Sequence, residues 1–217
     1  MNQYPKKLTA VLFDMDGTLV DSEDLHYENV VAVCAEYGYE FTAHDNMRFM
    51  GHSMTNIFNA LKPDFPSDIT FERFFDDNLA RFEKTIKKEH LFPGVLDTLQ
   101  YLKSKNIPMF VVTNGEQKAA DVALSKTEII HYFKGVITAA QVTKAKPDPQ
   151  PYLLAAQNLN IPIEQCLIVE DSATGATSGI KAGGYVIALD HTMGRDQLQM
   201  ANKIVTNFAE IPFKSLF

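Results

Sequence analysis

The chain has 217 residues, of which 46% are hydrophobic and 22% are charged, and its formal net charge is -7. This composition is typical of a soluble globular protein with one well-filled core, or with a core domain that carries a smaller insertion. The acidic balance and the lack of a dense lysine and arginine cluster argue against nucleic-acid binding, because a nucleic-acid-binding protein needs a basic face.

The cysteines and the N-terminal residues indicate in which cellular compartment the protein is expected. Cys34 and Cys166 are the only cysteines and have no Cys-x-x-Cys spacing, so we expect buried free thiols rather than a disulfide framework or a zinc site. The apolar run that precedes Asp14 is too short for a signal sequence or a membrane span. We therefore expect a cytoplasmic protein with no membrane partner, and we expect it to be a monomer.

The first predicted element is a buried strand that ends at two acids. Residues 7–13 form a mostly apolar run, which stops at Asp14 and Asp16 and is followed by Gly17. The two carboxylates can converge if the backbone curls at this point, and a glycine permits the curl. On these residues alone an acidic turn and an active site at the carboxyl end of a parallel strand are equally acceptable interpretations.

The segment 21–88 shows helical patterns and contains no good candidate for a buried parallel strand, which predicts a helical insertion. Helices are expected over residues 25–37, 56–61 and 71–88. The last of these carries a stripe of apolar residues at helical spacing, and we expect this stripe to pack in a core rather than to stack on a ligand. Its members are Phe71, Phe74, Phe75, Leu79, Phe82 and Ile86.

From residue 92 onward helices and short apolar runs alternate, which predicts a doubly wound parallel sheet. Helices are expected over 95–105, 116–126, 151–159 and 173–182, and strands over 109–112, 135–137, 166–169, 185–189 and 204–205.

Two of these later strands also stop at polar residues, and one loop carries a candidate cation. Thr113 and Asn114 follow one strand and can hold phosphate oxygens, while Glu170 and Asp171 follow another. Lys146 lies on a proline-stiffened loop just ahead of a helix. Acids that converge on one site repel each other unless a cation is present, and oxygen ligands without a histidine pair select a hard ion such as Mg²⁺.

The string Asp-Met-Asp-Gly-Thr-Leu-Val-Asp-Ser at residues 14–22, after an apolar strand, resembles the first motif of the haloacid dehalogenase superfamily. Thr113, Lys146 and the Glu170/Asp171 pair occur in the order and strand context of the other three motifs. The resemblance covers nearly the whole chain and implies an α/β doubly wound parallel sheet over 1–20 and 89–217, a Rossmann-like core. A small helical cap domain over 21–88 is similar to that of the branch with β-phosphoglucomutases and sugar-phosphate phosphatases.

This resemblance also implies roles for the motif residues. Asp14 is expected to be the nucleophile that forms an aspartyl-phosphate, and Asp16 the general acid and base. Mg²⁺ is expected to bind Asp14 and Asp171, with Glu170 assisting directly or through water and Asp16 lending its backbone carbonyl. The phosphoryl group is expected to contact the following residues: Thr113, Asn114 and Lys146.

Hydrolysis of a small phosphorylated metabolite, a sugar phosphate above all, is the favoured function. A phosphosugar mutase is the alternative, and a catalytically inactive binding or scaffold module is a third one, which the intact nucleophile, acid and lysine disfavour. Met54 stands where the resemblance places an arginine that binds a second phosphate in the mutase, which favours the phosphatase. Cap residues expected near the substrate are His26, His52, Ser53 and Met54.

Overall fold

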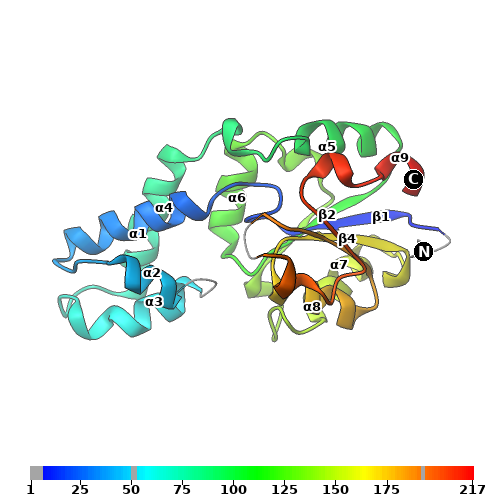
Figure 1. The fold of residues 1–217 in the computed structure, drawn as a ribbon. Coiled ribbons are helices and arrows are strands. Elements are labelled where there is room, and N and C mark those ends of the chain that lie inside the picture. Colours follow the sequence, from blue (N-terminus) through cyan, green and yellow to red (C-terminus); the bar gives the residue numbers. More distant parts are fainter. Residues whose placement is uncertain (1–6, 50–52, 192–193) are drawn as a thin grey trace. The chain divides into compact units, whose positions relative to one another are not determined.

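The computed structural model describes residues 7–49, 53–191 and 194–217, and these residues form two compact units (Figure 1). The larger unit contains the chain up to Asp21 together with Lys88–Phe217. The smaller unit is Ser22–Lys87, which interrupts the larger one in sequence.

The larger unit is built on one parallel sheet of six strands in the order β3-β2-β1-β4-β5-β6. The strands are β1 (Ala10–Phe13), β2 (Met109–Val112), β3 (Val136–Ile137), β4 (Cys166–Glu170), β5 (Tyr185–Leu189) and β6 (Lys203–Val205). Every residue of β1, β2, β4 and β5 is buried, as expected of parallel strands that are covered on both faces. The predicted α/β doubly wound fold is confirmed.

Helices cover both faces of this sheet. They are α5 (Val95–Ser104), α6 (Gln117–Lys126), α7 (Gln150–Leu159), α8 (Ala173–Ala182) and the short α9 (Phe213–Leu216). In Figure 1, α5 and α9 lie on one side of the sheet, and α7 and α8 lie on the other. Because side chains alternate along a strand, Leu12 packs in a cluster with Tyr152 and Ala176, whereas Phe13 stacks on Phe208.

The strands β2 and β4, which pair with the central strand β1, end at the same level as β1. Phe13 is in register with Val111 of β2 and with Val169 of β4. The backbone N–H of Asp14 continues the ladder and donates to the carbonyl of Val169 at 2.9 Å. The residues that follow β1, β2 and β4 therefore meet at one edge of the sheet.

The smaller unit is helical, with α1 (Glu23–Glu36), α2 (Ala43–Phe49), α3 (Met54–Leu61) and α4 (Phe71–Thr85). The helix α2 was not predicted, because its seven residues carry too few apolar positions for a helical period. Its start does carry a signal, since the backbone N–H of Asp45 donates to the Thr42 hydroxyl and the Asp45 carboxylate accepts from the Thr42 backbone N–H. This reciprocal pair is a capping box.

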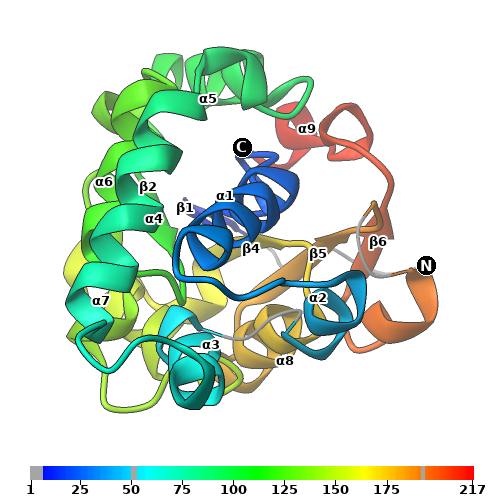
Figure 2. The same cartoon turned by 90° about the vertical axis from the view of Figure 1, so that its left-hand side faces the viewer.

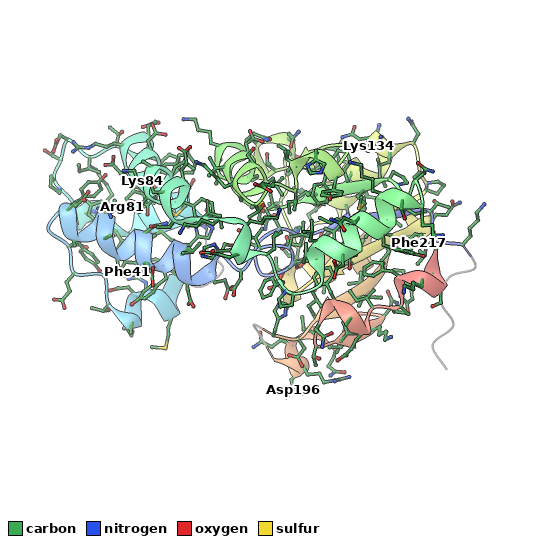
Figure 3. All side chains as sticks on the ribbon, turned by 90° about the horizontal axis from the view of Figure 1, so that it is seen from above. Phe41, Arg81, Lys84, Lys134, Asp196 and Phe217 are labelled. Atoms are coloured by element: carbon green, nitrogen blue, oxygen red, sulfur yellow. The ribbon has the colours of Figure 1, made fainter. Side chains whose placement is uncertain are left out.

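The core of the helical unit is aromatic. The helices α1 and α4 lie side by side (Figure 2). Arg81 of α4, which is labelled in Figure 3, forms an ion pair with Glu36 of α1. Phe74 of α4 is fully buried, and its ring centroid lies 5.6 Å from that of Phe58 and 5.8 Å from that of Phe65. The predicted core role of the α4 stripe is confirmed for Phe74.

Both cysteines are free and buried, as predicted. Burial raises the pKa of each thiol to about 12, so neither Cys34 nor Cys166 supplies a thiolate nucleophile at neutral pH. Among residues 7–49, 53–191 and 194–217, no helix has the length and apolar character needed to cross a membrane.

Replacement of Phe74 by alanine is expected to lower the free energy of unfolding by about 3–5 kcal/mol, because it leaves a cavity among packed rings. Urea denaturation followed by far-UV circular dichroism measures this loss. Met47→Ala is the control, because the Met47 side chain is 69% exposed and its loss is expected to change stability little. A Phe74→Ala protein that unfolds at the wild-type urea concentration would contradict the packing described above.

Candidate active site

Four buried polar side chains meet where β1, β2 and β4 end. Asp14 follows β1, Thr113 follows β2, Glu170 is the last residue of β4, and Asp171 comes next. The turn after Asp14 depends on Gly17, which has a φ of +77° and packs so closely on the Asp171 carboxylate that a Cβ would overlap with it. Only a glycine fits at this position, because it meets both constraints.

The ammonium group of Lys146 lies at the centre of this cluster. Its Nζ donates to Asp14 Oδ1 at 2.5 Å, to Glu170 Oε1 at 2.6 Å and to the carbonyl oxygen of Val112 at 2.7 Å. Three N–H groups thus have three acceptors, and the side chain is almost completely buried. Lys146, whose loop by itself is equally typical of a solvated surface lysine, therefore bridges the ends of all three strands.

Glu170 is held by donors on both of its carboxylate oxygens. Besides Lys146, the hydroxyl of Tyr152 donates to Oε1 at 2.7 Å. Oε2 accepts from the Ser172 hydroxyl at 3.0 Å and from the backbone N–H groups of Asp171 and Ser172 at 3.2 and 3.3 Å. The carboxylate lies against Gly175 in the first turn of α8, where a Cβ would overlap with it. A negative charge is favourable there, because it faces the positive end of the helix dipole.

The electrostatics of the cluster are unbalanced. Burial, followed by the charge of Glu170, raises the pKa of Asp14 well above its usual value, although Lys146 opposes this shift. Burial lowers the pKa of Lys146, but the carboxylates of Asp14 and Glu170 outweigh burial, so that the pKa of Lys146 is raised. If all groups are ionised, the three acids and one lysine leave two uncompensated negative charges in a buried site.

The acids fit a divalent metal ion. In the described part of the chain, ligand oxygens of Asp14, Glu170 and Asp171 lie within 4.8 Å of one another. The Thr18 hydroxyl donates to Asp171 Oδ1 at 3.1 Å and so orients that carboxylate. Hard, oxygen-only donors and two surplus negative charges suit Mg²⁺, which this family generally uses.

The loop after β2 carries Thr113 and Asn114, which were predicted to bind phosphate, and their side chains make different contacts. The Thr113 hydroxyl accepts from the backbone N–H of Gly115 at 2.9 Å. The Asn114 amide instead holds the Lys146 backbone, because Oδ1 accepts from its N–H at 3.1 Å and Nδ2 donates to its carbonyl at 3.3 Å. Asn114 therefore ties the β2 loop to the lysine loop.

Asp16 lies at the same edge of the sheet and is more exposed than Asp14. A Cβ placed on Gly115 would lie 3.8 Å from Asp16 Oδ2, which locates this carboxylate beside the β2 loop.

Thr18, Ser172 and Tyr152 were not predicted as site residues. The sequence marks Ser172 as a candidate N-cap of α8, because serine is a favoured residue at that position. Tyr152 lies on the apolar face of α7, where the sequence pattern indicates only a core residue.

The four predicted cap residues belong to the helical unit. The His26 ring stacks on Phe82, with centroids 4.6 Å apart. Ser53 is the N-cap of α3, where its hydroxyl accepts from the Asn56 backbone N–H at 3.3 Å, and Met54 begins this helix and packs on the aromatic core. His52 lies outside the described residues. The role of all four in substrate binding stays a prediction.

Residues 11–189 match the family model of the haloacid dehalogenase-like hydrolases. The chain belongs to this family. The predicted superfamily and its hydrolase class are confirmed.

Named phosphatases and a solved structure are similar to this chain. The chain is 31% identical over 180 residues to the phosphorylated carbohydrates phosphatase of Thermotoga maritima, covering 81% of this chain and 82% of that protein. It is 30% identical over 183 residues to the 6-phosphogluconate phosphatase of Escherichia coli, covering 82% and 80%. The crystal structure of β-phosphoglucomutase from Clostridium difficile shares the fold, with a TM-score of 0.79 at 21% identity and coverage of 96% and 95%.

In EDTA at pH 8, Asp14→Asn is expected to melt at a higher temperature than the wild type. The raised pKa of Asp14 means that its ionised form destabilises the fold, and the neutral amide removes this effect. As the pH falls through the raised pKa, the wild-type carboxyl takes up a proton and the difference shrinks. Thermal melts over a pH series measure it, and the surface variant Asp196→Asn is the control. A lower melting temperature for Asp14→Asn at pH 8 would contradict this assignment.

Addition of Mg²⁺ to the metal-free protein is expected to raise its melting temperature. At one hundred times the dissociation constant the gain is about 2.7 kcal/mol, which corresponds to about 5–10 °C for a chain of this length. Differential scanning calorimetry measures the shift. Asp171→Asn is expected to lose most of it and Asp196→Asn to keep it, and an equal shift in both variants would place the metal elsewhere.

Proposed function

We propose that the protein is a Mg²⁺-dependent phosphatase that hydrolyses a small phosphorylated metabolite, a sugar phosphate in particular, through an aspartyl-phosphate. The observation that carries this proposal is the buried Asp14 carboxylate, which is held by Lys146 within a cluster of acids fit for a metal ion. The relatives named phosphatases of phosphorylated carbohydrates and of 6-phosphogluconate support the substrate class.

In the first step an oxygen of Asp14 forms a bond to the substrate phosphorus, and the bond from phosphorus to the ester oxygen breaks. Asp16 in its protonated form gives its proton to this leaving oxygen, so that a neutral alcohol departs. The partial exposure of Asp16 suits a group that must gain and lose a proton in each cycle.

In the second step Asp16, now a carboxylate, takes a proton from a water molecule. The oxygen of this water attacks the phosphorus, and the bond between phosphorus and Asp14 breaks. Inorganic phosphate is released, and Asp14 and protonated Asp16 are restored. One residue therefore serves as acid in the first step and as base in the second.

Lys146 neutralises the transferred group. All three of its N–H groups already have acceptors, so a phosphoryl oxygen must displace one of them, and Asp14 is the partner that turns to the phosphorus. Thr113 contributes its hydroxyl to the phosphate, whereas Asn114 contributes its backbone N–H because its amide holds the lysine loop.

A bound Mg²⁺ neutralises charge on the phosphoryl oxygens. Asp14, Asp171 and the backbone carbonyl of Asp16 would hold it, since both oxygens of Glu170 already accept hydrogen bonds from protein donors. Glu170 then acts on the site through Lys146.

The helical unit Ser22–Lys87 serves as the cap in this proposal and carries the substrate contacts His26, His52, Ser53 and Met54. A phosphosugar mutase is the second candidate, because β-phosphoglucomutase has the same fold. Met54 disfavours it, because a thioether cannot bind the second phosphate of a sugar bisphosphate as an arginine would.

The proposed function predicts Mg²⁺-dependent release of phosphate from p-nitrophenyl phosphate and from a subset of sugar phosphates. Asp14→Asn is expected to reduce turnover below detection because it removes the nucleophile. Asp16→Asn is expected to reduce it by about 10²–10⁴-fold because the proton carrier is lost. Phosphate release is measured colorimetrically, with Asp196→Asn as the control.

Two outcomes would contradict this function. Near-normal turnover by Asp14→Asn would rule out the covalent step. Rapid interconversion of β-glucose 1-phosphate and glucose 6-phosphate without release of phosphate would establish the mutase instead.

A further inference from the structure

Tyr152 of α7 contacts both Lys146 and Glu170, which form an ion pair next to Asp14. It lies outside the motifs from which the site was predicted. Its side chain is fully buried, and its hydroxyl donates to Glu170 Oε1 at 2.7 Å. The Nζ atom of Lys146 lies 5.0 Å from the centre of its ring. One residue therefore binds the carboxylate through its hydroxyl and supports the ammonium group through its aromatic face.

When the Asp14 carboxylate no longer accepts a hydrogen bond from Lys146, the orientation of the Lys146 ammonium group depends on Glu170. The two remaining acceptors are the Val112 carbonyl and Glu170 Oε1. The first is part of a buried strand of the sheet and cannot move, whereas the second belongs to a side chain with rotatable bonds. With one N–H fixed at the Val112 carbonyl, the direction of the rest of the ammonium group therefore depends on the position of the Glu170 carboxylate.

Tyr152 donates to the same oxygen of Glu170 that Lys146 contacts, and so fixes the remaining rotation of this carboxylate. Oε2 is fixed by Ser172 and by backbone N–H groups at the start of α8. On Oε1, Tyr152 is the one donor other than Lys146 that is found in the described residues. Without the hydroxyl, the oxygen that directs Lys146 has no fixed partner apart from Lys146 itself.

We propose that Tyr152 is a positioning residue, which fixes Glu170 and through it keeps the Lys146 ammonium group aimed at Asp14 and at the phosphoryl group that Asp14 receives. This inference rests on the proposed function for its catalytic consequence. Its geometric part, the control of Lys146 by Tyr152, can be tested without turnover.

Tyr152→Phe removes only the hydroxyl and keeps the ring beneath Lys146. We expect kcat for the best sugar phosphate to fall about tenfold, because Lys146 is less well aligned when charge develops, while KM and the Mg²⁺ concentration for half-maximal rate stay within about twofold. Tyr37→Phe is the matched control, because its hydroxyl donates to the Asp77 carboxylate at 2.6 Å in the helical unit. An unchanged kcat in Tyr152→Phe would overturn the catalytic part.

A double-mutant cycle with Glu170→Gln separates positioning from general destabilisation. If Tyr152 acts through Glu170, the Tyr152→Phe change is expected to reduce kcat by less than about twofold when Glu170→Gln is already present. Equal fold-losses in both backgrounds would show that Tyr152 acts independently of Glu170 and would overturn the proposal.

Nuclear magnetic resonance of ¹⁵N-labelled lysine side chains tests the geometry directly. The Lys146 ammonium signal, assigned by its absence in Lys146→Arg, is expected to shift or to exchange faster in Tyr152→Phe and to stay unchanged in Tyr37→Phe. An unchanged signal in Tyr152→Phe overturns the proposal whether or not the protein turns over. A shifted signal in a protein that hydrolyses no phosphate ester would support the positioning of Lys146 and refute the proposed function.

Discussion

The site depends on one buried ammonium group. A lysine with an almost inaccessible side chain costs several kcal/mol in lost hydration unless every N–H group finds an acceptor, and Lys146 finds its three in Asp14, Glu170 and Val112. Each acceptor comes from a different strand end. The same two ion pairs and one hydrogen bond that make this buried charge tolerable therefore hold the ends of β1, β2 and β4 together, in the arrangement that the proposed phosphoryl transfer uses.

The lysine also explains the arrangement of the residues around it. The Asn114 amide holds the backbone of the loop that carries Lys146, and Tyr152 with the N-terminus of α8 holds Glu170. Gly17 leaves room for the Asp171 carboxylate, and Gly175 leaves room for that of Glu170. If all its groups are ionised, the cluster has two unbalanced negative charges, which makes it a good site for a divalent cation and a costly one without metal.

Local patterns predicted most of the fold, because a buried parallel strand needs a continuous apolar run and this chain has such runs at each of the main strands. They failed for α2, a short helix whose start is set by the Thr42 and Asp45 capping box rather than by an apolar period. They also failed for Tyr152, since a tyrosine on the buried face of a helix has the same pattern whether its hydroxyl is structural or bound to a site.

The sequence by itself determined the α/β fold, the family and the set of charged residues at the strand ends, because spacing along the chain decides which residues follow each strand. The tertiary structure alone decided how these residues are connected. It showed that Asn114 turns its amide to the Lys146 backbone and that the oxygens of Glu170 are occupied by protein donors. The bonds that join Asn114 to Lys146, and Tyr152 and Lys146 to Glu170, span 18 to 32 residues of sequence, and no local pattern encodes such contacts.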